Sequence, residues 1–390
     1  MSEIYSSIGN AFVGTATPYY VESGHFYLES NNIKDGQINH NTEIFINDEF
    51  YEKQKDKWLH TGDMVMVQSG HVGHAAVITE KLNNSAAHAL IMFRNLKEKI
   101  EPYFLNYQYQ TVKSKKKIEN ITIGNTIKHI LASEMQQFEV DIPKLEEQKK
   151  IAEYFTNLDN LITLHQRKLT HLQAKKKSLL QKMFPKKGER FPELRFPGFT
   201  DAWEQRKLGE ISEKITTKNS SLEYTETFTN SAEYGIISQR DFFDKDISNK
   251  ANLTGYYIVQ DDDFVYNPRI STTAPVGPIK RNKLGRTGVM SPLYYVFKTH
   301  DIDNTFLEKY FGTTGWHEFM YLNGDSGARA DRFAIKDAVL CEMPVPYPSV
   351  MEQKKIGQFL KNLDHLITLH QRKLAHLQTQ KKALLQQMFV

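Results

Sequence analysis

A segment of 38 residues occurs twice in this chain of 390 residues, with the two copies 205 positions apart. Each copy opens with the letters EQKKI and closes on a phenylalanine, Phe184 or Phe389, and 27 of the 38 positions are identical. The stretches that precede the copies are of similar length but share little sequence. A nearly identical frame joined to two unlike modules indicates a fixed scaffold that presents two different recognition surfaces.

Within each copy, apolar residues recur at alternating spacings of three and four over four heptads, which is the pattern of a coiled coil. Neither copy contains Gly or Pro between positions 156 and 184 or 361 and 389, so nothing interrupts a helix. Two histidines in this pattern would disfavour shifted registers. The predicted seam consists of Leu158, Ile162, His165, Leu169 and Leu172 in the first copy and Leu363, Ile367, His370, Leu374 and Leu377 in the second, ending at Met183 and Met388.

The order of segments along the chain predicts how the two helices would pair. If they pair antiparallel, the second helix runs back toward the first module, and the modules lie at opposite ends of one rod. A seam of 29 residues would be about 40 Å long. Successive major-groove half-sites on one face of DNA are about 34–36 Å apart, so such a rod could act as a ruler. The alternative is that each helix packs on its own module.

Each module has a mixed pattern of short strands and helices. The expected strands are 26–28, 43–46, 64–67 and 75–78 in the first module and 235–237, 255–259, 264–266 and 293–297 in the second, with turns at 34–36 and 60–63. The predicted fold class is α+β: two mixed α/β domains separated by two long helices that form an antiparallel coiled coil, with an internal pseudo-two-fold duplication. The predicted domains are 1–146 (first recognition domain), 147–189 (central helix), 190–350 (second recognition domain with its lead-in segment) and 351–390 (C-terminal helix).

Composition narrows the class of protein further. A single cysteine, Cys341, excludes an intrachain disulfide framework and suits a reducing compartment. The N-terminus has no charged-then-apolar signal pattern, and no apolar run approaches the roughly 20 residues that span a bilayer. We therefore expect a cytoplasmic protein that does not bind a membrane. The net charge of +4 is too small to identify a nucleic-acid binder, although lysines cluster at 113–117, 175–177 and 186–187.

No catalytic motif is visible in the sequence. There is no Gly-rich phosphate loop, no HExxH, no paired-cysteine spacing and no Asn/Asp-Pro-Pro-aromatic motif of an adenine methyltransferase. His71 and His74 lie on either side of Gly73 and suggest a metal pair, but no third ligand stands nearby in the sequence. Zinc sites normally have three or four protein ligands, so we expect neither a metal site nor catalysis.

Three motifs together resemble the specificity (S) subunit of type I restriction-modification enzymes. They are the entry segment 142–151 (IPKLEEQKKI) with its shorter counterpart 352–356, the helices that follow, and 196–209 (FPGFTDAWEQRKLG), which is similar to the family's lead-in to a recognition domain. The resemblance covers essentially the whole chain. One departure bears on how the first module docks: Glu3-Ile4 aligns with Glu210-Ile211, so this sequence shows no lead-in before the first module.

The resemblance implies a non-catalytic subunit of a DNA methylation and restriction complex, in which each module reads one half of a bipartite target in double-stranded DNA. It also implies two methyltransferase subunits on the helices and restriction subunits in the same complex, with S-adenosylmethionine, ATP and Mg on those partners and no cofactor in this chain. The candidate methyltransferase contacts are Arg167, Lys168, Arg372 and Lys373. The runner-up is a duplicated coiled-coil adaptor that binds proteins and not DNA.

Reading base edges requires forked polar groups on loops or strands that can enter a groove. The candidates at corresponding places in the modules are Asn31, Asn32, Gln68, Ser69 and His71 in the first and Gln239, Arg240, Asn267, Arg269, Ser271 and Thr272 in the second. Phosphate contacts position DNA without specifying its sequence. The candidates for those contacts are Lys115, Lys116, Lys128, Lys280, Arg281, Arg329 and Arg332.

Overall fold

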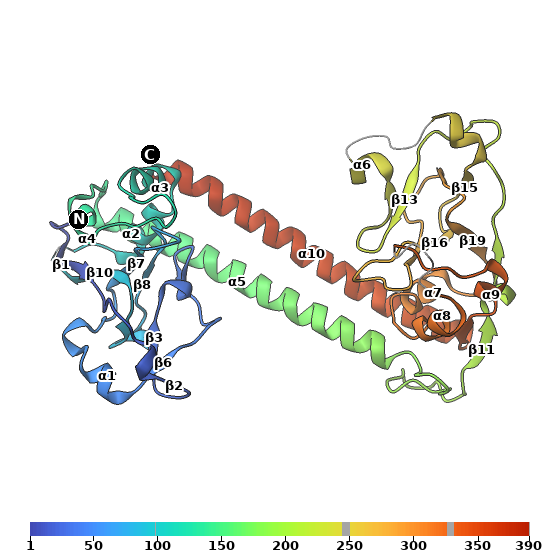
Figure 1. The fold of residues 1–390 in the computed structure, drawn as a ribbon, viewed down its shortest axis with the longest axis horizontal. Coiled ribbons are helices and arrows are strands. Elements are labelled where there is room, and N and C mark those ends of the chain that lie inside the picture. Colours follow the sequence, from blue (N-terminus) through green and yellow to red (C-terminus); the bar gives the residue numbers. More distant parts are fainter. Residues whose placement is uncertain (98, 244–249, 326–330, 390) are drawn as a thin grey trace. The chain divides into compact units, whose positions relative to one another are not determined.

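The computed structural model describes residues 1–97, 99–243, 250–325 and 331–389. The chain divides into two compact units. Unit 1 is Met1–Arg167 with Gln371–Val390, and unit 2 is Lys168–His370. Each unit therefore contains one module and part of each long helix (Figure 1).

The repeated segments form the two long helices that the sequence predicts, α5 (Leu145–Lys182) and α10 (Val350–Met388). Inside unit 1 they pair antiparallel, because Phe155 of α5 lies near Phe389 whereas Asp159, one turn further on, binds Lys381. Inside unit 2 the pairing is also antiparallel, because Lys176 of α5 binds Asp364 of α10, whereas the later Phe184 shares a core with the earlier Leu360.

Unit 1 is built on a four-stranded antiparallel sheet in the order β1 (Tyr5–Asn10), β10 (Leu90–Leu96), β7 (Met64–Val67) and β8 (Ala75–Val77). All four residues of β7 are buried, because the sheet is covered on both faces. Met64 and Met66 point into one core and Val65 and Val67 into another, as the two-residue period of a strand requires.

The rest of the first module covers the edges and faces of this sheet. The remaining strands are β2 (Tyr20–Val21), β3 (His25–Leu28), β4 (Ile33–Lys34), β5 (Gln37–Ile38), β6 (Phe45–Ile46) and β9 (Ala86–Ala87). The helices are α1 (Asp48–Glu52), α2 (Pro102–Tyr109), α3 (Val112–Asn120) and α4 (Ala132–Gln137). The predicted turn at 34–36 is confirmed as the tight connection of β4 and β5, with Asp35 and Gly36 at positive φ.

Unit 2 repeats the sheet with the same relative strand order: β12 (Ser212–Lys214), β19 (Tyr295–Thr299), β16 (Phe264–Tyr266) and β17 (Ile279–Arg281). The other strands are β11 (Glu204–Lys207), β13 (Phe228–Ser231), β14 (Gly235–Ser238), β15 (Tyr257–Val259), β18 (Gly288–Met290) and β20 (Pro344–Tyr347). The helices are α6 (Gln239–Phe243), α7 (Asn304–Tyr310), α8 (His317–Asn323) and α9 (Asp337–Cys341). The two sheets thus share one topology although their sequences differ.

Each module core is completed by the end of the helix from the other copy. In unit 1, Phe389 at the end of α10 packs against Phe104 of α2, with ring centroids 5.2 Å apart. In unit 2, Phe184 after α5 packs in the same way against Phe306 of α7 at 5.3 Å. The beginning of each helix also packs on its own module, since Phe155 and Leu360 are fully buried there. Both arrangements considered from the sequence therefore occur in the same helices.

A glutamine of the EQKKI motif joins each helix to its module. Gln148 accepts a hydrogen bond from the backbone N–H of Glu101 and donates one to the carbonyl of Pro143. Gln353 makes the equivalent pair of bonds to Asp303 and Pro348. Both side chains are buried. The repeated motif therefore fixes the start of the long helix against α2 or α7, which explains why this part of the frame is shared by unlike modules.

The end of the predicted seam is confirmed in the first copy and wrong in the second. Met183 is buried in unit 2, whereas Met388 is 38 % exposed, and Leu385 and Phe389 are buried in unit 1 in its place. The two copies differ here because their ends pack on modules of unlike sequence. Of the other predicted seam residues, Leu158, Leu169, Leu172, Leu363, Leu374 and Leu377 are buried, and Ile162, His165, Ile367 and His370 are half-buried.

Candidate nucleic-acid interface

Most of the polar candidates lie on equivalent connections of the two sheets. Gln68, Ser69 and His71 belong to the loop between β7 and β8, and a second group belongs to the loop between β16 and β17, formed by Asn267, Arg269, Ser271 and Thr272. Since β7 and β16 occupy the same place in the two sheets, the loops leave the same sheet edge in each module. The sequence suggests that these two loops are equivalent, and the shared strand order of the two sheets supports that equivalence.

In unit 1 the β7–β8 loop and α3 enclose a pocket of about 380 Å³. It is lined by His71 and by two of the phosphate candidates, Lys115 and Lys128. Gly73 makes this arrangement possible, because its φ is +85° and a Cβ there would lie 2.9 Å from Ile118 of α3. Three predicted residues from three separate segments, namely the β7–β8 loop, α3 and the stretch after α3, therefore line one pocket of a size that suits a phosphate or a base edge.

His74 forms the wall of this pocket rather than a ligand pair with His71. Its Nδ1 accepts a hydrogen bond from the backbone N–H of Asp35, and burial lowers the pKa of His74, so the neutral imidazole is favoured. Among the described residues, no group of three or more His, Cys, Asp or Glu side chains is placed to hold a metal ion.

Asn32 is a wrong prediction as a base-reading residue. It is 2 % exposed, its Oδ1 accepts from the N–H of Glu29, and its Nδ2 donates to the carbonyls of Asn39 and Thr42. The amide therefore holds a turn together. Its neighbour Asn31 is exposed and stays a candidate.

The other candidates of unit 1 differ in how accessible they are. Gln68 is half-buried and its Oε1 has no hydrogen-bond partner in the described residues, while Ser69 is half-buried and bridged to His129. Lys116 is exposed on α3, and Lys128 is exposed but lies 3.5 Å from Glu119. These lysines keep their charge at the surface, where phosphate contacts would form.

In unit 2 the β16–β17 loop is held by its own side chains. The Nδ2 of Asn267 donates to the carbonyl of Asn230, and its Oδ1 accepts from the N–H of Arg269. Both polar groups of the Asn267 side chain are therefore bonded within the module, whereas the side chain of Arg269 is 64 % exposed and lies 3.7 Å from the carboxylate of Asp331. Ser271 and Thr272 are exposed as well. Arg269 is consequently the forked group that this loop offers to solvent.

The candidates at the start of α6 lie apart from that loop in the sequence. Arg240 is exposed, and Gln239 is half-buried with an Oε1 that has no partner in the described residues. A buried amide oxygen without a hydrogen-bond partner costs free energy. A donor from a bound molecule would remove that cost by bonding the Oε1 of Gln239.

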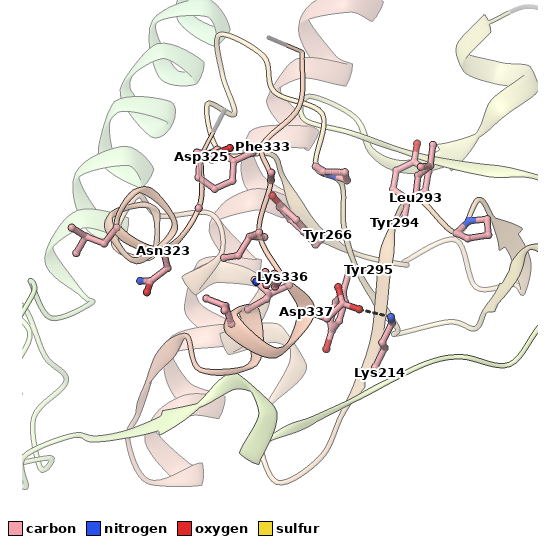
Figure 2. A pocket seen from close by; sticks show the side chains of 18 residues that line it. Lys214, Tyr266, Leu293, Tyr294, Tyr295, Asn323, Asp325, Phe333, Lys336 and Asp337 are labelled. Atoms are coloured by element: carbon pink, nitrogen blue, oxygen red, sulfur yellow. Dashed lines mark hydrogen bonds and ion pairs between the residues drawn. The ribbon is translucent and has the colours of Figure 1, made fainter. Parts of the chain in front are cut away.

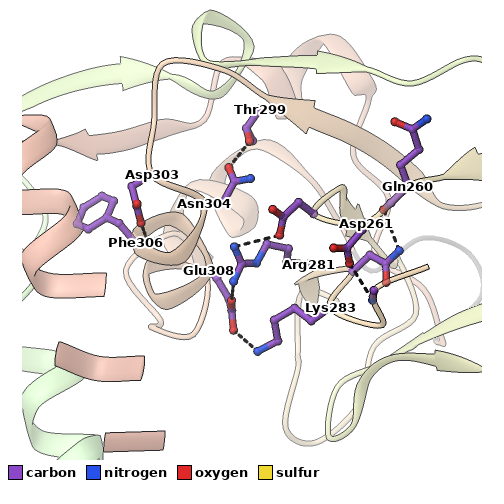
Figure 3. Close-up of polar contacts among 12 residues, drawn as sticks. Gln260, Asp261, Arg281, Lys283, Thr299, Asp303, Asn304, Phe306 and Glu308 are labelled. Carbon is purple, nitrogen blue, oxygen red and sulfur yellow. Dashed lines mark hydrogen bonds and ion pairs between the residues drawn. The ribbon is translucent and has the colours of Figure 1, made fainter. Parts of the chain in front are cut away.

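Arg281 is a wrong prediction as a phosphate contact. Its side chain is only 10 % exposed, and its guanidinium binds Glu308 at 2.6 Å and Asp262 at 3.3 Å (Figure 3). Lys283 shares Glu308, with its Nζ 2.7 Å from Oε1. The adjacent Lys280 is half-buried, and burial lowers its pKa. Arg281 and Lys283 therefore belong to an ion-pair network that joins Glu308 of α7 to β17 and the residues after it.

Arg332 is half-buried and bridged to Arg269, which places it beside the same loop. Arg329 lies outside the described residues.

A second pocket, of about 720 Å³, lies next to the bridge between Arg269 and Arg332, since its lining includes Pro268 and Phe333. No pattern in the sequence predicts this pocket. Figure 2 shows Tyr266, Tyr294, Tyr295 and Phe333 around it, and the Nζ of Lys214 bound to Asp337 at 2.5 Å. The lining comes from five separated segments of unit 2, so no local pattern could have revealed it. Aromatic rings with nearby cations are able to stack on bases and hold phosphates.

Two modules with one sheet topology, different polar loops at the same edge and a duplicated helix pair define a protein with two separate recognition sites. The chain belongs to the type I restriction modification DNA specificity family, whose domain model matches residues 8–174 and again residues 200–379. Its function is therefore in DNA recognition, and an adaptor that never contacts DNA is not favoured.

Two relatives by sequence are named as type I restriction enzyme specificity subunits of Methanocaldococcus jannaschii. The chain is 27 % identical to one named "Putative type I restriction enzyme MjaX specificity subunit", over 81 % of this chain and 74 % of the relative. It is 24 % identical to the type I restriction enzyme MjaVIII specificity subunit, over 92 % and 84 % of the two chains.

Solved structures share the fold at low sequence identity. The S subunit of the type I restriction-modification system from M. genitalium matches with a TM-score of 0.55 at 15 % identity, covering 100 % of this chain and 94 % of that one. A chain from a structure concerning complex assembly and conformational transition of the type I R-M system matches with a TM-score of 0.51 at 16 % identity, covering 100 % and 96 %.

Within the part of the chain that the structure describes, no helix is both long and apolar enough to cross a membrane.

Proposed function

We propose that each module of this specificity subunit reads one half of a bipartite target in double-stranded DNA. The observation that carries the proposal is the pair of equivalent sheet loops with unlike side chains: His71 in unit 1 and Arg269 in unit 2 project from the same place in one topology. Forked or ring-nitrogen groups on such loops can bond base edges in a groove. Two different half-sites follow from two different loops.

Exposed lysines next to the loop of unit 1 support phosphate contacts there. Lys115 and Lys128 line the pocket with His71, and Lys116 is exposed on the same helix, α3. Contacts of this kind would position the duplex so that His71 meets a base.

The two helices supply equivalent surfaces for two methyltransferase subunits. Arg167 and Lys168 of α5 recur 205 positions later as Arg372 and Lys373 of α10, and all four are exposed. Restriction subunits would join the same complex. Catalysis, S-adenosylmethionine, ATP and Mg would then reside on the partner subunits, and this chain would supply only specificity and assembly.

The test is to co-express the chain with its cognate methyltransferase subunit and to map adenine methylation across the host genome by single-molecule sequencing. We expect a bipartite motif that is methylated in each half and is absent without this chain. Exchange of residues 1–146 for the module of another specificity subunit should change one half of the motif and leave the other intact. A change in both halves, or no motif in a stable complex, would contradict the proposal.

A further inference from the structure

Three aromatic side chains meet at the surface of unit 2, on the turn of one hairpin and on the short helix that follows it. Tyr234 lies in the turn between β13 and β14 and is 64 % exposed. Phe242 and Phe243 are 41 % and 37 % exposed and belong to α6, which follows β14 directly and contacts both strands (Figure 1). We name these three residues the aromatic tip. Large apolar side chains that gather at a surface mark a contact with another molecule.

The rings of the aromatic tip support one another in a row. Phe242 packs edge-on against Phe243, with ring centroids 4.6 Å apart. Tyr234 in turn packs edge-on against Phe242 at 6.4 Å. Edge-to-face pairs of this kind are favourable beyond the area that they bury. The outermost ring, that of Tyr234, is therefore held in place although most of it faces solvent.

The turn that carries Tyr234 is fixed by its own residues. The Oγ of Ser231 accepts hydrogen bonds from the backbone N–H groups of Glu233 and Tyr234, at 3.3 and 3.2 Å. Gly235 closes the turn at a φ of +74°, which favours glycine. A ring on such a turn loses little conformational freedom when it binds, because its backbone is already ordered.

The hairpin is bonded to the β16–β17 loop, which carries Arg269. The Nδ2 of Asn267 donates to the carbonyl of Asn230 in β13 at 2.8 Å, and its Oδ1 accepts from the N–H of Arg269 at 3.0 Å. From Asn230 to Tyr234 the chain spans at most about 14 Å. Because a DNA strand rises 3.4 Å per base, Tyr234 lies within roughly four base pairs of this contact.

The other side of the aromatic tip adjoins further candidates for DNA contacts. The helix α6 begins with Gln239 and Arg240, and the Oε1 of Gln239 is buried without a hydrogen-bond partner among the described residues. A protein bound over the aromatic tip would also cover these residues and keep DNA away from them. In a chain with two DNA specificity domains, the occupant that fits this position is therefore the DNA itself.

We propose that Tyr234 stacks on a base of the target duplex at an unstacked step beside the half-site of unit 2, while Phe242 and Phe243 hold its ring. This inference rests on the proposed function of unit 2 in reading DNA. Apolar side chains that enter between base pairs unstack them and kink the duplex. Stacking on an aromatic ring tolerates any base, since every base has a π face. Tyr234 thus adds affinity and distortion, whereas Arg269 reads the sequence.

The experiment uses the full chain in complex with its methyltransferase subunits and a duplex that carries the bipartite motif mapped by methylation. We expect Tyr234→Ala to lower the affinity at least about fivefold, as loss of a stacked base does. Tyr234→Trp should keep the affinity, because the ring is retained. The slope of log affinity against log salt should not change in either variant, because neither removes a phosphate contact.

The matched control is Tyr321→Ala, because Tyr321 is a tyrosine on α8 of the same unit that is 54 % exposed. It should change the affinity less than about twofold. Phe242→Ala should weaken binding less than Tyr234→Ala, since it removes the support of the ring and not the ring. The methylated motif should be the same in all these variants.

A second readout locates the unstacked step. 2-Aminopurine, placed in turn at each position in and beside the half-site, reports loss of stacking by a rise in fluorescence. We expect a rise at one step with the wild-type complex and its absence with Tyr234→Ala. The rise at the adenine that is methylated should remain in both, because that base leaves the stack to reach the methyltransferase.

Equal affinity of Tyr234→Ala and the wild type, or equal losses in Tyr234→Ala and Tyr321→Ala, would overturn the proposal. Loss of the methyltransferase subunits from Tyr234→Ala would also overturn it, because the aromatic tip would then bind a protein. A wild-type complex that binds the duplex without preference for the motif would instead contradict the proposed function itself. The two failures are therefore distinguishable.

Discussion

Lys381 of α10 lies 2.7 Å from Asp159 of α5, and the same contact recurs with the helices exchanged, because Lys176 of α5 lies 2.6 Å from Asp364 of α10. The first pair is in unit 1 and the second in unit 2. Each aspartate also binds its own module, Asp159 through the hydroxyl of Tyr107 at 3.0 Å and Asp364 through the Nζ of Lys309 at 2.6 Å. The same pair of helix residues therefore occurs in both units, and in each unit the aspartate also binds a different residue of the module.

Removal of Asp159 should destabilise unit 1. Asp159→Ala leaves the ammonium of Lys381, 14 % exposed, without its partner, and breaking a buried pair in this way costs about 3–5 kcal/mol. The double variant Asp159→Leu/Lys381→Met should recover most of the loss, because it removes both charges. Urea unfolding measures the effect. Glu146→Ala, which breaks a solvent-exposed pair with Lys149, should cost less than about 1 kcal/mol. A double variant as unstable as Asp159→Ala would show that the pair is not coupled.

Truncation of Phe389 should loosen the core of unit 1 from the far end of the sequence. Phe389→Ala removes contacts with Phe104 and Phe155 and should cost roughly 3–5 kcal/mol. Hydrogen exchange should then accelerate in α2 while the amides of α7 in unit 2 stay protected. Met388→Ala is the control, because Met388 is exposed, and its effect should be within about 0.5 kcal/mol. Faster exchange in α7 alone would contradict the assignment of Phe389 to unit 1.

Lowering the pH should raise the free energy of unfolding of unit 2, because the carboxyl of Asp263 becomes protonated. A variant without that carboxyl should lack this increase. Burial raises the pKa of Asp263 to about 6, so the folded state holds the proton to a higher pH than the unfolded state. Stability therefore falls as pH rises from about 4 to about 6, by roughly 2–3 kcal/mol. Asp263→Asn should remove this slope, as measured by urea unfolding at several pH values. Glu233→Gln, a change at an exposed residue of the same unit, should retain it. An unchanged slope in Asp263→Asn would exclude Asp263 as its source.

Neutralisation of the basic pocket should weaken DNA binding without changing its sequence preference. Lys115→Ala and Lys128→Ala should each lower the slope of log affinity against log salt by about 1. His71→Ala should instead relax the base preference in one half of the methylated motif, because the ring is a candidate base reader. Lys53→Ala, at an exposed residue at the end of α1, is the control and should change neither property. Loss of preference in both halves would contradict a reading role confined to unit 1.

Charge exchange on the helices should prevent assembly. The variant Arg167→Glu/Lys168→Glu/Arg372→Glu/Lys373→Glu should no longer co-purify with the methyltransferase subunit, because all four cations are exposed on the repeated helices. Weak DNA binding by the isolated chain should remain. Lys175→Glu, an exposed change on α5, serves as the control. Unchanged co-purification of the fourfold variant would remove these residues from the interface.

Local patterns were sufficient for some elements and not for others. The strand at 64–67 was predicted because four apolar residues stand between turns, and β7 occupies those residues. Asn32 and Arg281 were predicted as DNA contacts because of their side-chain chemistry. In the folded protein these side chains bond to Thr42 and Glu308 instead. The sequence does not show such pairs, because they depend on distances that exist only after folding.

The duplication, the two uninterrupted helices and the resemblance to a family can be recognised in the sequence alone. The predicted antiparallel pairing places the end of the second helix beside the first module, but it does not identify the residues that Phe184 and Phe389 contact. Those contacts exist only in the folded protein, where Phe389 packs on Phe104 and Phe184 on Phe306, because their partners lie far away in the sequence. The folded protein also determines which of the equivalent glutamates, Glu147 and Glu352, is buried, because a buried carboxylate requires a partner cation, and Arg195 is bound to Glu352.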